Sequence, residues 1–71
     1  MEHRMQVREV LTNNFGLVRV RIEASAGVTP HDVIEHARKA ALEASQGPVE
    51  FLYAVGEHDL LFAGPRPEAT A

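Results

Sequence analysis

The sequence predicts a small single α+β domain, in which one helix packs on one face of a four-stranded, mainly antiparallel sheet in the order β-β-α-β-β. Three observations lead to this prediction. Residues 29–48 carry the start and stop signals of a helix, residues 17–24 alternate as a half-buried strand does, and two short apolar runs follow the helix. A chain of 71 residues has room for one such domain, which we place at residues 1–64, before a flexible tail at residues 65–71.

The first two strands form a predicted hairpin around the loop "NNFG". In "LVRVRIEA" every second residue is apolar, so that Arg19 and Arg21 share one side of the strand with Leu17. The preceding "MQVREVLT" predicts the partner strand, and the Asn and Gly residues between them suit a tight turn. Residues 2–12 could instead form a short helix, but their β-branched residues favour a strand.

The helix is the most clearly marked element. Thr29 stands at the N-cap, Pro30 suits the first helical position, and Asp32 places a carboxylate in the first turn. Gly47 and Pro48 close the run in the usual order. At about 100° per residue, one apolar stripe forms. It consists of Val33, Ile34, Ala37, Ala40, Ala41 and Ala44.

The stretches "VEFLYAVG" and "DLLFAG" bracket "EH" and predict a second hairpin. Two hairpins can combine into a fully antiparallel sheet, or the terminal strands can lie side by side and parallel. The second order is that of the β-grasp fold. The short stretches "MQ", at the start of the first strand, and "LLFAG", near the end, resemble ubiquitin, a β-grasp protein. This resemblance bears on the strand order, and no function is carried over from it.

Composition narrows the function classes. The chain has no cysteine, which excludes disulfides and cysteine-based zinc sites and favours a reducing, cytoplasmic location. It has no apolar run long enough to span a membrane and no signal-peptide pattern. The net charge is −3, but the first 21 residues contain four arginines against two glutamates. Arg8, Arg19 and Arg21 therefore form a candidate nucleic-acid-binding ribbon on the first hairpin.

Two histidine clusters are the candidates for metal binding or acid–base chemistry. In "HDVIEH", His31 and His36 are five residues apart, so they diverge by about 140° around a helix, and pairs such as His31 with Glu35 offer only two ligands. In "GEHD", His58 lies between carboxylates in a predicted turn. No nucleophile motif or phosphate-binding loop is present. We therefore predict no catalytic residue, no metal and no cofactor.

The last two strands are apolar on both sides, although one helix can cover only one face of a sheet. Val49, Phe51, Tyr53 and Val55 alternate with Leu52 and Ala54, and we place the second set outward together with Leu61 and Ala63. We expect a second apolar surface that binds another protein, with interface residues Leu42, Leu52, Ala54, Leu61 and Ala63. The predicted function is that of a small non-catalytic interaction module, such as an inhibitor, adaptor or accessory regulator, that self-associates and also binds an unidentified protein. The alternative is a nucleic-acid-binding regulator that uses the arginine-bearing hairpin.

Overall fold

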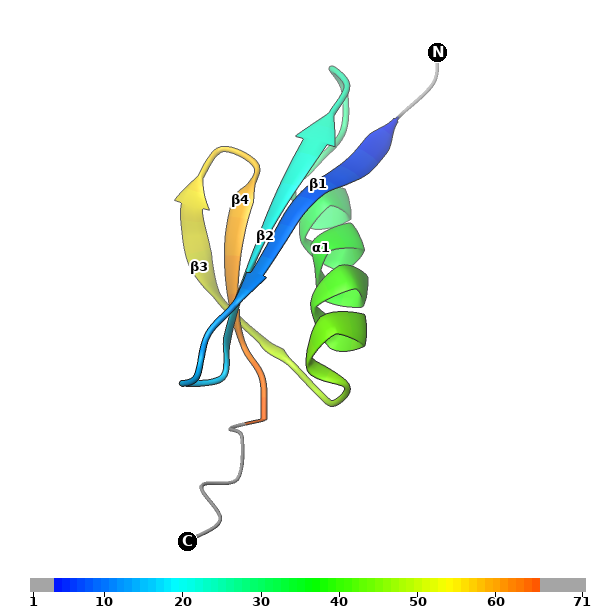
Figure 1. Ribbon diagram of the computed structural model, residues 1–71. Helices are drawn as coiled ribbons and strands as arrows, with labels where there is room; N and C mark the ends of the chain where they lie inside the picture. Colours follow the sequence, from blue (N-terminus) through cyan, green and yellow to red (C-terminus); the bar gives the residue numbers. More distant parts are fainter. Residues whose placement is uncertain (1–3, 66–71) are drawn as a thin grey trace, which may run out of the picture.

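A computed structural model describes residues 4–65 and confirms the predicted fold class. The elements are β1 (Met5–Thr12), β2 (Leu17–Ala24), α1 (Pro30–Ser45), β3 (Glu50–Gly56) and β4 (Asp59–Ala63). One helix lies against one face of a four-stranded sheet (Figure 1). No helix within residues 4–65 is long and apolar enough to cross a lipid bilayer. Of the predicted tail, residues 66–71 lie outside the described part of the chain.

The strand order is β1-β2-β4-β3, and all three neighbouring pairs are antiparallel. The alternative β-grasp order is therefore not found. Since β2 and β3 both run antiparallel to β4, they point the same way, with β4 between them. The pairing of β2 with β4 places Val18 opposite Phe62 and Val20 opposite Leu60, and all four side chains are buried. Pairing apolar residues on one face fixes this register, because a slip by one residue would turn them towards solvent.

Residues 5–12 form a strand and not a helix, and the turn that follows explains how the chain reverses. The Asn13 side-chain oxygen Oδ1 accepts hydrogen bonds from the backbone amides of Phe15 (2.9 Å) and Leu17 (3.0 Å). Gly16 has φ 83°, a left-handed conformation that glycine adopts without a steric cost. The asparagine and glycine of "NNFG" thus have separate roles in the turn.

Helix α1 begins as the sequence predicts and ends with one difference. Thr29 is the N-cap, and its hydroxyl accepts a hydrogen bond from the Asp32 amide at 3.1 Å. At the other end, the left-handed residue is Gln46 (φ 59°), whose amide donates to the Leu42 carbonyl at 2.9 Å. Glycine usually adopts this left-handed conformation at a helix end, but here Gln46 adopts it and Gly47 is the next residue.

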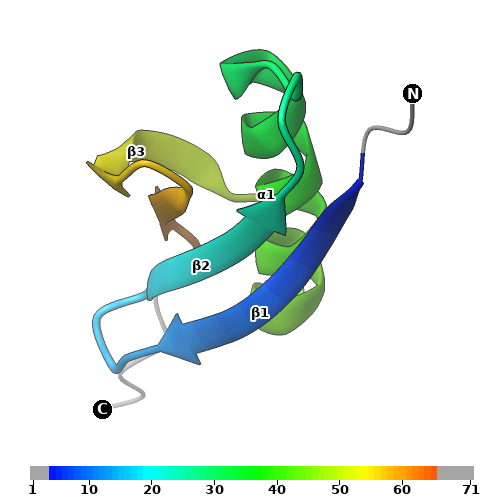
Figure 2. The same ribbon diagram turned by 90° about the horizontal axis from the view of Figure 1, so that it is seen from above.

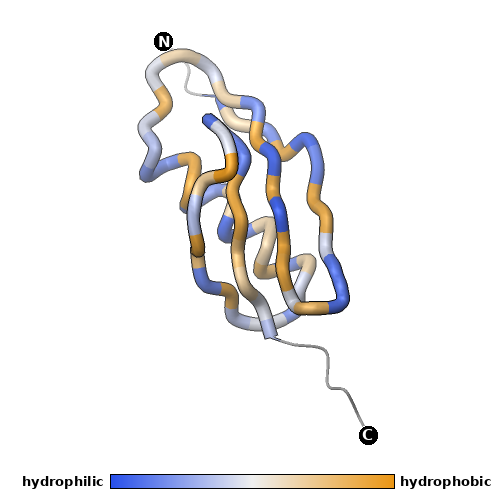
Figure 3. The backbone as a smooth tube through the Cα atoms, turned by 90° about the vertical axis from the view of Figure 1, so that its left-hand side faces the viewer, coloured by the Kyte–Doolittle hydropathy of each residue, from blue (hydrophilic) through white to orange (hydrophobic). Residues whose placement is uncertain are grey.

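The core lies between α1 and the inner face of the sheet. Its buried members are Val18, Val20, Ile22, Val33, Ala37, Ala41, Leu60 and Phe62. The small alanines let the helix approach the sheet closely, while the strands supply the bulk. Helix α1 packs mainly against β2 and β1, and β3 lies away from it on the far side of β4 (Figures 1 and 2). Hydrophobic and hydrophilic positions alternate along β2, whereas β3 and β4 are mainly hydrophobic (Figure 3).

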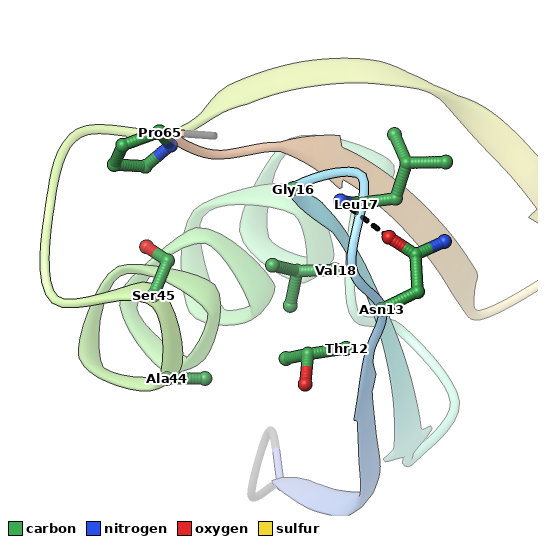
Figure 4. A pocket seen from close by; sticks show the side chains of 8 residues that line it. All are labelled: Thr12, Asn13, Gly16, Leu17, Val18, Ala44, Ser45 and Pro65. Atoms are coloured by element: carbon green, nitrogen blue, oxygen red, sulfur yellow. Dashed lines mark hydrogen bonds between the residues drawn. The ribbon is translucent and has the colours of Figure 1, made fainter. Parts of the chain in front are cut away.

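Three segments meet at the end of the domain that holds the β1–β2 turn. The Gly64 amide donates to the Gly16 carbonyl at 2.7 Å, which ties the end of β4 to the turn. A Cβ on Gly47 would come within 2.6 Å of the Pro65 ring. Ser45, at the end of α1, lines the same small pocket as Gly16 and Pro65 (Figure 4). These close approaches hold the C-terminal end of α1 next to the sheet.

Candidate protein-interaction surface

The sheet face that points away from α1, here called the outer face, is organised in rows of cross-strand partners. One row contains Leu11, Arg19, Leu61 and Tyr53, each opposite the next on the neighbouring strand. A second row contains Glu9, Arg21, Asp59 and Gly56. Residues opposite one another in an antiparallel pair share a face, so these rows define which side chains are outward. The outer face therefore carries both apolar and charged side chains.

Strand β3 departs from simple alternation because it contains two bulges against β4, one between Phe51 and Tyr53 and one between Ala54 and Gly56. Alternation predicted Ala54 on the outer face and Tyr53 on the inner one. The register places Tyr53 opposite Leu61 on the outer face and Ala54 opposite the buried Leu60. Each bulge adds one residue, so the side-chain direction changes there. This prediction about the direction of Ala54 was wrong.

The most exposed part of the sheet's apolar surface lies on β3. Leu52 is 41% exposed, Tyr53 58% and Val55 46%. Ala54 is exposed as well, although it lies on the inner side, because α1 hardly reaches β3. Beside them on the outer face, Leu61 and Ala63 are half-buried. An exposed apolar patch on adjoining strands is typical of an interaction surface, whereas single exposed apolar residues are common on any protein.

The apolar surface continues across the outer face into a shallow hollow of about 190 Å³. Its apolar lining comes from Leu11, Leu17 and Leu61, with Arg19 at its side. We call the whole set the apolar sheet surface; it comprises Leu11, Leu17, Leu52, Tyr53, Val55, Leu61 and Ala63. The predicted interface residues Leu52, Leu61 and Ala63 belong to it. Leu42 does not, because it is exposed on α1, in the other layer of the domain.

Four members of the apolar sheet surface were not predicted as interface residues: Leu11, Leu17, Tyr53 and Val55. A signal existed for one of them. The alternation of β2 already placed Leu17 on the same side as Arg19. Leu17 could therefore have been predicted as an outward-facing interface residue. Tyr53 was assigned inward because the bulges are not visible in the residue pattern. Val55 lies at a bulge and is exposed.

The three candidate arginines lie together on the outer face, and each is paired with a carboxylate. Arg8 approaches Glu23 at 3.3 Å, and Arg21 approaches Glu9 at 3.2 Å. Both pairs are largely exposed, so they contribute little to stability. Their effect is on charge: the guanidinium groups are neutralised locally by carboxylates of the same sheet.

The pair between Arg19 and Asp59 has a more specific geometry. Arg19 donates two parallel hydrogen bonds, from Nε to Oδ1 at 2.9 Å and from Nη2 to Oδ2 at 2.6 Å. The Asp59 side chain is only 16% exposed. These hydrogen bonds lower the pKa of the Asp59 carboxyl, and the positive charges of Arg19 and Arg21 act in the same direction. The same hydrogen bonds raise the pKa of Arg19. Asp59 is therefore held in its charged form.

The histidine clusters form no site among the residues that the structure describes. His31 and His36 lie on the first turns of α1, and no group of three or more His, Asp or Glu side chains within residues 4–65 is placed to hold a metal ion. His58 lies in the β3–β4 turn, at the side of an open hollow lined by Arg8, Glu9 and Arg21. The guanidinium groups of Arg8 and Arg21 in that hollow are already paired with carboxylates.

The pocket of Figure 4 is small, about 210 Å³, and the Asn13 oxygen in it already accepts two backbone hydrogen bonds.

Comparison with known proteins assigns no family. No protein-family model matches this chain, and the searches of curated proteins and of solved structures give no match.

Proposed function

We propose that this protein is a small, non-catalytic protein-interaction module of the cytoplasm that self-associates through its apolar sheet surface. The observation that carries the proposal is the exposure of Leu52, Tyr53 and Val55 beside the half-buried Leu61. When a partner covers apolar surface of this kind, the free energy of the system falls by about 25 cal/mol for each Å² removed from water. Inhibitors, adaptors and accessory regulators act by binding alone and fit a chain of this size.

The chemistry of the described residues supports binding without catalysis. The charged groups of the outer face, including Arg19 and Asp59, are engaged with one another. A general base or nucleophile needs a partner and a substrate pocket, and the hollows of residues 4–65 that we describe are shallow.

The ion pairs also weigh against the nucleic-acid alternative. A phosphate would have to displace a carboxylate from Arg8, Arg19 and Arg21, and the carboxylates would then repel the backbone of the nucleic acid. Proteins that bind nucleic acid usually present a surplus of positive charge, whereas this chain has a net charge of −3. No observation on the outer face favours that function over protein binding.

Light scattering coupled to size-exclusion chromatography tests the proposal. We expect a mass above the chain mass of 7.8 kDa at micromolar concentration for the parent protein. Leu61→Arg places a charge in the centre of the apolar sheet surface and should give a monomer. Because Leu61 is half-buried, Tyr53→Lys serves as a second variant at a more exposed position.

Leu42→Arg is the matched control. Leu42 is 46% exposed, but it lies on α1 and not on the outer face, so this variant should associate like the parent. Circular dichroism confirms that each variant is folded. A parent protein that remains monomeric at every concentration, or one whose mass is unchanged in folded Leu61→Arg and Tyr53→Lys, would refute self-association through this surface.

A further inference from the structure

We draw no further inference here: the strongest candidate, the apolar sheet surface with its shallow hollow at Leu11, Leu17 and Leu61 on the outer face, carries nothing beyond the proposed function, because nothing in the structure of residues 4–65 shows what covers it.

Discussion

Asp59 shows how one residue joins several features of the outer face. It is the first residue of β4, it lies opposite Arg21, and it accepts two hydrogen bonds from Arg19. Arg19 itself lies opposite Leu61, beside the hollow of Leu11 and Leu17. The pair therefore keeps the guanidinium directed along the sheet at the side of the apolar sheet surface. Arginine suits this role better than lysine because its planar group matches a carboxylate with two bonds.

The lowered pKa of Asp59 predicts a specific dependence of stability on pH. Because the folded pKa lies below the unfolded value of about 3.9, the charged carboxylate stabilises the fold at any pH above that value. The contribution is lost as the pH falls through the folded pKa. Asp59→Asn should therefore melt at a lower temperature than the parent at pH 7. The difference should shrink towards zero in strong acid.

Thermal melting of both proteins followed by circular dichroism from neutral pH to strong acid makes the comparison. Glu43→Gln, on the exposed side of α1, is the control for the loss of one negative charge and should follow the parent more closely. A difference between Asp59→Asn and the parent that stays the same at all pH values would contradict the assignment.

At the scale of elements, the sequence predicted the features that depend on neighbouring residues, such as the start of a helix and a turn. Thr29, Pro30 and Asp32 set the start of α1, and the asparagine and glycine of "NNFG" set the first turn, because these residues act through their own backbone and nearest neighbours. The order of the strands depends on which apolar faces can be joined in three dimensions, so the sequence left two orders open. The bulges of β3 arise from its fit to β4 and carry no residue signature, which is why Tyr53 and Ala54 were assigned to the wrong faces.

The N-cap offers a direct measure of how far α1 supports the domain. Thr29→Ala removes the hydroxyl that accepts the Asp32 amide, so one amide at the helix start loses its partner. We expect a loss of about 1 kcal/mol in the free energy of unfolding, measured by urea denaturation. Thr29→Ser keeps the hydroxyl and should stay close to the parent. An equal loss in both variants would mean that the threonine methyl, and not the cap, matters at this position.

The whole molecule is small, and its stability is limited by the area it can bury. A domain of this length buries only about 60% of the surface of its unfolded chain, and without cysteine it has no disulfide to compensate. The alanine-rich helix contributes little bulk, and β3 remains mostly outside its cover. The domain and its association are therefore expected to depend on each other.

If folding and association are linked in this way, the melting temperature rises with protein concentration. Where dimer dissociation and unfolding occur in one step, a tenfold increase should raise the melting temperature by roughly 3–6 °C. Differential scanning calorimetry across a dilution series provides the measurement. Folded Tyr53→Lys should melt at the same temperature throughout the series, and a parent protein that does likewise would show that the fold is stable on its own.

The bulged, charged edge of β1 has a consequence for growth of the sheet. Within residues 4–65, β1 is paired with β2 on one side and with no strand on the other. Arg8, Glu9 and the bulge between Val7 and Glu9 lie along this strand. A strand added there would have to pair with an irregular ladder beside two charged side chains, which natural edge strands use to discourage such pairing. This edge is therefore protected against the stacking of strand on strand that builds a fibre.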